Sequence, residues 1–340
     1  MKSFATLPAA ERALYWRNHA ERAGVPEFIA EKDFWVCWLL RHIFATPELG
    51  AQCVFKGGTS LSKVFGAIHR FSEDIDLALT PASLGWEEAD LDNAPSHSQR
   101  RKRNAQLQAD CSSAVETRFM PALETVVTAA LGPRPETGHW LSFEQDAASR
   151  SPVILFPYPR AVAPGSYIPP LVKMEFGSLT DQRPTGTHTI TPLIARLAPD
   201  AFDDFHAEVC ALEIERTFWE KATILHAEYH RPTDQPIRDR FARHYSDFAA
   251  LWQHPGGRAA AARVDLLERV RLHKSRFFAS SWARYETAVP GTLRLVPPDA
   301  RIPELRRDYA VMEPMFLSPP PEFDTVLATL REAEDTINAT

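Results

Sequence analysis

The sequence predicts a mixed α/β domain over residues 1–200, followed by an all-helical domain over residues 201–340. Short runs rich in apolar residues indicate about five buried strands in the first part. These runs cover residues 54–55, 74–79, 153–156, 171–176 and 187–193. From Ala201 almost to the end, apolar residues recur at helical spacing instead. We therefore expect a mixed-sheet core of the α+β or α/β class, flanked by helices and followed by a helical C-terminal domain.

The composition is that of a globular protein without membrane segments. Hydrophobic residues make up 44% of the 340 residues and charged residues 24%. No apolar run approaches the roughly 20 residues that span a bilayer. The four cysteines are scattered and form no metal-binding pattern, which predicts reduced thiols in a cytoplasmic protein. The net charge of −6 argues against a general nucleic-acid coat protein but allows a local basic surface.

The stretch from Val54 to Leu79 carries the main functional signal. A short apolar run meets Gly57-Gly58, and helical spacing predicts a helix from about Thr59 or Ser60. Two glycines let a backbone approach a ligand closely, and a helix start offers unpaired N–H groups and a positive dipole end. Lys63, one turn further, adds a mobile positive charge. These features together are typical of a phosphate-binding turn.

A pair of aspartates follows this turn on a predicted strand. Asp74 and Asp76 are two residues apart, so they share a face of the strand, roughly 7 Å apart. Neighbouring carboxylates repel each other unless a cation lies between them, and hard oxygen ligands suit magnesium. A lone Gly-Gly is usually a turn, and a lone Asp-x-Asp is usually a solvated strand edge. Together within 26 residues they predict a metal-dependent nucleotidyl-transfer site.

Two motifs in this stretch resemble those of a known family. They are Phe-Lys-Gly-Gly-Thr-Ser-Leu-Ser-Lys at residues 55–63 and Phe-Ser-Glu-Asp-Ile-Asp-Leu at residues 71–77. The chain resembles the AbiEii/MenT-type toxin nucleotidyltransferases, a branch of the DNA polymerase β-like superfamily. The resemblance implies Mg²⁺, with Mn²⁺ as an alternative, and an NTP substrate. It also implies transfer to the 3′ end of tRNA, arrested translation and a cognate antitoxin protein.

The resemblance extends to the helical part and to a third carboxylate. Phe-Trp-Glu-Lys-x-x-x-Leu-His at residues 218–226 is similar to the family's lysine motif, in which Lys221 would meet the triphosphate. Residues 240–248 resemble a later motif that makes Asp247 the fourth-motif acid and places Arg243 and His244 in the same cleft. Ala242 and Ser246 depart from that pattern. Glu175 is the candidate third carboxylate, and an ordinary ion pair with Lys173 is its alternative.

The resemblance and the residue chemistry together assign roles to particular residues. The predicted catalytic residues are Asp74, Asp76, Lys221 and Asp247. The predicted metal ligands are Asp74, Asp76 and Glu175. The predicted nucleotide-binding residues are Gly57, Gly58, Thr59, Ser60, Lys63, Arg243 and His244. Another motif of the family, Glu31-Lys32-Asp33-Phe34, precedes the glycines, and we interpret it as part of a helix that packs under the site.

Two basic segments are candidate RNA-binding surfaces. Arg100–Arg103 begin a predicted long helix that ends near Leu131. A second helix is predicted over Arg258–Arg276, with basic residues at positions 263, 269, 271, 274 and 276. Solvated helix faces explain both segments equally well. Two other functions stay open: a non-catalytic NTP or RNA sensor of the same fold, and a nucleotidyltransferase that modifies a protein or a small molecule.

Overall fold

A computed structural model describes residues 1–87, 96–147, 149–165, 168–197 and 204–340. The chain divides into two compact units. Unit 1 comprises Met1–Val64 and Phe71–Ala211, and unit 2 comprises Phe65–Arg70 and Leu212–Thr340. The C-terminal part of unit 2 thus begins a little beyond residue 200. The sequence alone does not indicate that residues 65–70 belong with it.

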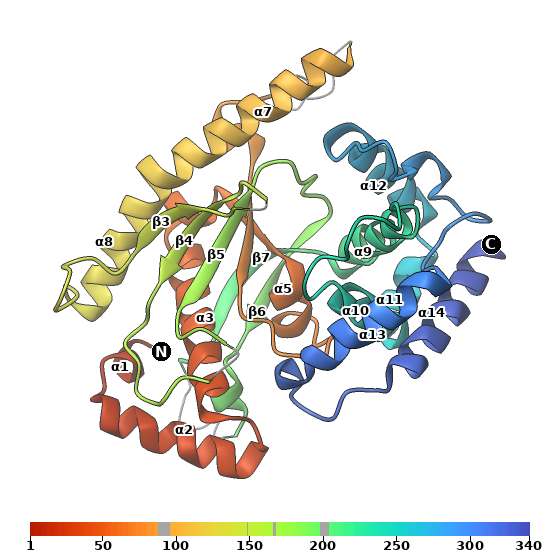
Figure 1. Cartoon of the computed structure of the whole chain (residues 1–340). Coiled ribbons are helices and arrows are strands. Elements are labelled where there is room, and N and C mark those ends of the chain that lie inside the picture. Colours follow the sequence, from red (N-terminus) through yellow and green to blue (C-terminus); the bar gives the residue numbers. More distant parts are fainter. Residues whose placement is uncertain (88–95, 148, 166–167, 198–203) are drawn as a thin grey trace. The chain divides into compact units, whose positions relative to one another are not determined.

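One mixed sheet forms the centre of unit 1, with the strand order β3-β4-β5-β2-β1-β7-β6 among the described residues (Figure 1). The strands are β1 (Cys53–Lys56), β2 (Ile75–Leu79), β3 (Ser142–Gln145), β4 (Pro152–Phe156), β5 (Val172–Gly177), β6 (Thr185–Ile190) and β7 (Ala207–Leu212). β2 pairs with β1 in antiparallel register and with β5 in parallel register. β1 also pairs with β7 in parallel. The mixed-sheet prediction is confirmed.

Two strands lie where the sequence pattern predicts none. β3 falls in a stretch rich in turn residues, and its side chains are mostly exposed because it is an edge strand. It therefore lacks the apolar alternation by which strands are recognised. β7 consists of Ala-Glu-Val-Cys-Ala-Leu, in which good helix formers hide the strand signal, and the helical prediction for this stretch is wrong.

The core of unit 1 lies on one face of the sheet. β5 alternates strictly, with Val172, Met174 and Phe176 buried and the residues between them half-buried. Helix α3 (Glu27–Ala45) is almost entirely buried, and Trp35 and Trp38 both contact the ring of Phe156. The apolar stripe of this helix is thus core, as the sequence predicts. The opposite face of β5 carries the polar side chains.

Six further α-helices lie in the described part of unit 1. They are α1 (Lys2–Ala5), α2 (Ala9–Ala23), α4 (Pro47–Gly50), α5 (Gly57–Lys63), α7 (His97–Ala114) and α8 (Met120–Leu131). A π-helical segment at Val115–Phe119 joins α7 to α8, which confirms the predicted long helix. The glycine-turn helix α5 begins two residues earlier than predicted and ends at Lys63, because the chain leaves unit 1 after Val64.

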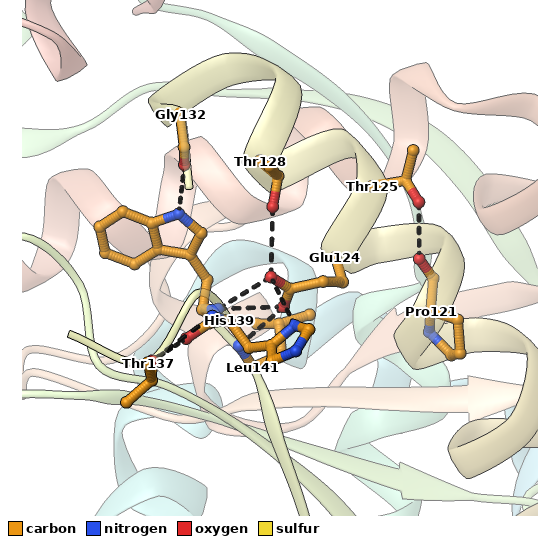
Figure 2. Close-up of polar contacts among 9 residues, drawn as sticks. Pro121, Glu124, Thr125, Thr128, Gly132, Thr137, His139 and Leu141 are labelled. Atoms are coloured by element: carbon orange, nitrogen blue, oxygen red, sulfur yellow. Dashed lines mark hydrogen bonds and ion pairs between the residues drawn. The ribbon is translucent and has the colours of Figure 1, made fainter. Parts of the chain in front are cut away.

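A half-buried carboxylate, that of Glu124, joins α8 to the start of β3 (Figure 2). Glu124 accepts hydrogen bonds from the main-chain N–H groups of Trp140 and Leu141, each at 2.8 Å, and from the hydroxyl of Thr128 at 3.2 Å. The indole N–H of Trp140 donates to the carbonyl of Gly132 at 2.7 Å. These bonds fix the loop between α8 and β3, so Glu124 has a structural role.

Unit 2 is built from helices packed around buried aromatic residues. The helices are α9 (Ile214–Tyr229), α10 (Ala242–Gln253), α11 (Pro255–Ala261), α12 (Val264–Phe277), α13 (Ile302–Val311) and α14 (Phe323–Asn338). The prediction of a single helix over residues 258–276 is wrong, because the helix is interrupted at Ala262–Arg263 and divides into α11 and α12. The indole N–H of Trp219 in α9 donates to the carbonyl of Ala260 in α11 at 3.0 Å. None of the described helices is long and apolar enough to cross a bilayer.

Candidate active site

The turn between β1 and α5 brings the backbone of Gly57 against the carboxylate of Asp76. Gly57 has a φ of +81°, in the left-handed region that residues with side chains disfavour. A Cβ atom at this position would lie 2.0 Å from Asp76 Oδ2, far inside van der Waals contact. Lys56, the preceding residue, pairs with Asp76 in the register of β1 and β2. Glycine is therefore required for the chain to turn into α5 beside this carboxylate.

The start of α5 combines accessible backbone with buried hydroxyl groups. Gly57 and Gly58 are half-buried, whereas Thr59 and Ser60 are fully buried. Thr59 Oγ1 donates to the main-chain oxygen of Asp74, which holds α5 to the segment leading into β2. The hydroxyl of Ser60 has no hydrogen-bond partner in the described part of the chain.

The predicted metal-binding carboxylates lie on adjacent strands of unit 1. Asp76 lies directly opposite Glu175 in the parallel register of β2 and β5, and Asp74 directly precedes β2. The pKa of Asp74 is raised to about 7, first by burial and then by the negative charges of Glu73, Asp76 and Glu175, while Lys32 opposes this rise. Negative charge is therefore in excess here, and a bound cation would relieve it.

The donor set of this face suits a hard divalent cation. Within the described residues, no group of three or more His, Cys, Asp or Glu side chains is placed to hold a metal by itself. Mg²⁺ commonly binds through one or two carboxylates and completes its shell with water and substrate phosphates. Asp74 and Asp76 fit that requirement. Glu175 Oε1 lies 2.6 Å from Lys173 Nζ, so the ion pair considered as its alternative is present in the structure.

Side chains of the Glu31-Lys32-Asp33 motif on α3 bond both to the residue next to Asp74 and to the glycine-turn helix α5. Lys32 Nζ lies 2.5 Å from Glu73 Oε2, next to Asp74, and donates to a main-chain carbonyl at 3.0 Å. Asp33 accepts from Lys63 Nζ at 2.6 Å and from a main-chain N–H at 2.6 Å. All three motif side chains are buried. The sequence analysis expected this helix to pack under the site. In the structure, the consecutive side chains of Lys32 and Asp33 bond α3 to several different segments of unit 1.

Lys63 lies in a different environment from the one expected of a mobile phosphate ligand. Its side chain is only 5% exposed and forms a buried ion pair with Asp33. Burial acts to lower the pKa of Lys63, but Asp33 more than offsets this and keeps the group protonated. In this structure Lys63 holds the C-terminal end of α5 to α3.

In unit 2, Asp247 lies between two cations. Arg70 donates to both carboxylate oxygens of Asp247, at 2.7 and 2.8 Å, and Lys221 Nζ donates to Oδ2 at 2.8 Å. All three side chains are less than 10% exposed. Burial alone would raise the pKa of Asp247, but the two cations more than offset it and hold the pKa well below its usual range. Burial lowers the pKa of Lys221, although Asp247 opposes this.

Arg243 and His244 lie on α10, in the turn before Asp247. The pKa of His244 is held well below its usual value by burial and then by the positive charges of Lys221 and Arg243. His244 is therefore neutral at physiological pH. Its Nδ1 atom is buried and has no hydrogen-bond partner within the described residues. This group of side chains carries more positive than negative charge, the reverse of the carboxylate face in unit 1.

The comparison that decides the family covers most of the chain. Residues 38–329 match the family described as nucleotidyl transferase AbiEii toxin of type IV toxin–antitoxin systems. The chain belongs to the AbiEii family. It is therefore a nucleotidyltransferase and the toxin of a type IV toxin–antitoxin pair. The predicted family is confirmed, and the sheet and flanking helices described above confirm the predicted fold class.

A solved structure with a related description is similar along nearly the whole chain. It is MenT4, a nucleotidyltransferase toxin from Mycobacterium tuberculosis H37Rv. The two chains share 17% sequence identity with a TM-score of 0.41, over 96% of this chain and 98% of that one. No curated protein matches the sequence.

In this AbiEii protein, a small pocket lies against the Arg70–Asp247 pair. It has a volume of about 70 Å³ and is lined on its other sides mainly by apolar residues of α10, α14 and the segment around Phe316. That volume holds roughly two water molecules, so the pocket is too small for a nucleotide base. The pocket lies where residues 68–70 pack against the helices of unit 2.

Arg70 is the member of the charged group around Asp247 that the sequence analysis did not identify. It stands four residues before Asp74, in a stretch whose aspartates and glycines carry the functional signal. Its partner Asp247 is 177 residues away in the chain, and no local pattern connects the two. The available signal is an arginine beside a motif of acidic residues, which by itself predicts only a local ion pair.

Proposed function

We propose that this enzyme transfers a nucleotidyl group from an NTP to a hydroxyl of RNA, with the 3′ end of tRNA as the acceptor. Blocked tRNA ends would arrest translation, which accounts for toxicity. The observation that carries the proposal is the contact between the Gly57 turn and Asp76. It places backbone suited to phosphate beside a carboxylate suited to a cation, as nucleotidyl transfer requires.

Asp74 and Asp76 would hold Mg²⁺ in this proposal, with Mn²⁺ as an alternative. The bound ion would neutralise the leaving pyrophosphate and lower the pKa of the acceptor hydroxyl. The half-buried backbone of Gly57 and Gly58 would bind phosphate oxygens. Glu73 and Lys32 would orient the Asp74 segment, since their ion pair is buried directly beside it.

Lys221 would meet the triphosphate, assisted by Arg70 and Arg243. Support comes from the family motif around Lys221 and from the excess of positive charge around Asp247. Both oxygens of Asp247 already accept bonds from cations, so we assign it the role of a positioning residue that keeps Lys221 and Arg70 in place. His244 is neutral and would accept or donate a single hydrogen bond. We assign Lys63 to the support of α5 and not to direct phosphate contact.

A cognate antitoxin follows from membership of a type IV toxin–antitoxin family. We propose that toxin and antitoxin act in the cytoplasm, where NTPs and tRNA are found. The four cysteines form no disulfide within the described residues, which fits such a reducing compartment.

The test is a transfer assay with each α-labelled NTP, total tRNA and Mg²⁺. We expect label at the 3′ end of tRNA, with a preference for one nucleotide, and loss of labelling in the Asp76→Asn variant, which keeps the size of the side chain. A chelator should abolish labelling, and added Mg²⁺ or Mn²⁺ should restore it. Label found in protein or in a small molecule, or full activity of Asp76→Asn, would contradict the proposal.

A further inference from the structure

The first turns of α7 carry three cations whose side chains have no partner among the described residues. The side chains of Arg100, Arg101 and Lys102 form no hydrogen bond or ion pair within the part of the chain that the structure describes. Arg101 and Lys102 are exposed, and from Ser98 to Gln106 no side chain is buried. We name Arg100, Arg101 and Lys102 the cationic end of α7.

We propose that the cationic end of α7 is a docking surface for the phosphate backbone of the RNA acceptor. This inference rests on the proposed function, because it takes RNA as the acceptor, and it adds where that RNA binds. Successive helix residues are separated by about 100°, so the three cations fan over about 200° of the helix circumference. Such a fan can contact phosphates on both sides of an RNA groove, where recognition of paired RNA is mainly by backbone and shape.

The stability of the fold does not account for these cations. A helix begins with a positive dipole end, where a cation costs about 0.3–1 kcal/mol instead of stabilising the helix. No acidic residue stands in the first turn of α7. The first acid along the helix, Asp110, accepts hydrogen bonds from Trp86 and Gln106. The positive charge therefore remains available to an anionic partner.

The rest of α7 anchors it to unit 1 and leaves this end projecting. Leu107 and Cys111 are buried, and the Leu107 carbonyl accepts a hydrogen bond from Ser178. Figure 1 shows the first turns of α7 extending beyond the strands of the sheet, while the later turns run along it. A rigid helix that presents cations away from the core can reach a large polyanion.

The other basic helix, α12, differs because cations on it are paired with acidic residues. Arg263 donates to both oxygens of Asp265, at 2.9 and 2.8 Å, and Arg271 forms an ion pair with Glu268 at 2.5 Å. Acidic residues of the same helix thus neutralise Arg263 and Arg271, two of the cations named in the sequence analysis. Because α12 is similarly basic in sequence but internally paired, it provides a matched control.

The experiment compares two double charge reversals in the full-length protein. Arg101→Glu/Lys102→Glu alters the cationic end of α7, and Arg263→Glu/Arg271→Glu alters α12 by the same net charge. Binding of a fluorescent tRNA is measured by anisotropy between about 50 and 200 mM salt, a range in which phosphate contacts make affinity strongly salt-dependent. NTP binding and the thermal midpoint are measured in parallel as controls for the site and the fold.

We expect the α7 variant to flatten the log–log salt dependence by about 1.4–1.8 units, because each lost phosphate contact removes about 0.7–0.9. Its NTP binding and thermal midpoint should stay unchanged, and the α12 variant should keep the wild-type slope. Unchanged tRNA binding in the α7 variant, or an equal loss in both variants, would overturn the inference. So would loss of binding to a polyglutamate peptide with tRNA binding intact, which would indicate an acidic protein partner.

The transfer assay separates this inference from the proposed function. If wild-type protein labels tRNA and the α7 variant labels it equally well at the same subsaturating tRNA concentration, the docking surface is wrong while the function stands. If wild-type protein binds tRNA through α7 but labels another acceptor, the function is wrong while the docking surface stands. If wild-type protein does not bind RNA, both are wrong.

Discussion

Replacing Gly57 with alanine should disable the enzyme while leaving it folded. The new Cβ atom would lie 2.0 Å from Asp76 Oδ2, whereas ordinary contact begins at 3.4 Å. The turn and the carboxylate must therefore separate by about 1.4 Å. A misplacement of about 1 Å in a reacting group can cost about 100-fold in rate, so we expect transfer to fall at least that far.

The cost in stability should be much smaller. Alanine in the left-handed region costs about 1–2 kcal/mol, and the clash itself can be relieved by rotation of the Asp76 side chain. In a unit of this size, each kcal/mol lowers the thermal midpoint by about 2–4 °C. The thermal midpoint of Gly57→Ala, measured by calorimetry, should thus be a few degrees below that of wild type, while label transfer is almost entirely lost.

Gly85→Ala is the matched control for this experiment. Gly85 has a φ of +80°, nearly identical to that of Gly57, but apart from its chain neighbours no heavy atom of the described residues lies within 4 Å of the position that a Cβ would take there. It should show the same backbone strain and the same small thermal shift, with activity retained. If Gly57→Ala keeps wild-type transfer, or if both variants lose it equally, the Gly57–Asp76 contact does not position the reacting groups.

Three further results are expected. Asp247→Asn should lower the free energy of unfolding by about 3–5 kcal/mol in denaturant titration, because it leaves the buried Arg70 and Lys221 without their counter-charge; a change below about 1 kcal/mol would contradict a positioning role. Glu175→Gln should reduce label transfer far less than Asp76→Asn, since Glu175 is bonded to Lys173; equal losses would make it an essential ligand. Burial raises the pKa of Glu31 from 4.5 to about 7, so ionisation destabilises the fold as pH rises through that range. The free energy of unfolding of Glu31→Gln should therefore rise by up to about 3 kcal/mol relative to that of wild type as the pH increases from 4.5 to about 7. Denaturant unfolding at each pH measures this difference, and a difference that does not change with pH would refute it.

Local patterns allowed much of unit 1, and the proximity of two of its candidate site motifs, to be predicted. Gly57-Gly58 and the Asp74–Asp76 pair lie within one strand–turn–helix–strand segment, so their proximity follows from local geometry. The long helix ending at Leu131 and the strands β4 and β5 are likewise marked by periodicity. β3 and β7 were not predicted, because an exposed edge strand and a strand of helix formers both lack the usual signal.

The partners of buried charges could not be predicted from the sequence. Lys63 has the position of a phosphate ligand, but its ammonium group bonds Asp33, 30 residues earlier. Asp247 has the position of a catalytic acid, but Arg70 and Lys221 occupy both of its oxygens. A sequence shows which residues are charged, whereas three-dimensional packing decides which of these charges are already neutralised.

Each unit carries a charged group, and the two groups differ in the sign of their excess charge. In unit 1 the carboxylates around Asp74 outnumber the nearby cation Lys32, and burial followed by these negative charges raises the pKa of Asp74. In unit 2 the cations around Asp247 outnumber that single carboxylate, and burial followed by the charges of Lys221 and Arg243 lowers the pKa of neighbouring His244. A metal–nucleotide substrate carries both complementary charges, a divalent cation and a polyphosphate. Under the proposed function, the acidic group would bind the cation and the basic group the phosphates, and we assign Asp247 to the basic group because both of its oxygens accept bonds from Arg70 and Lys221.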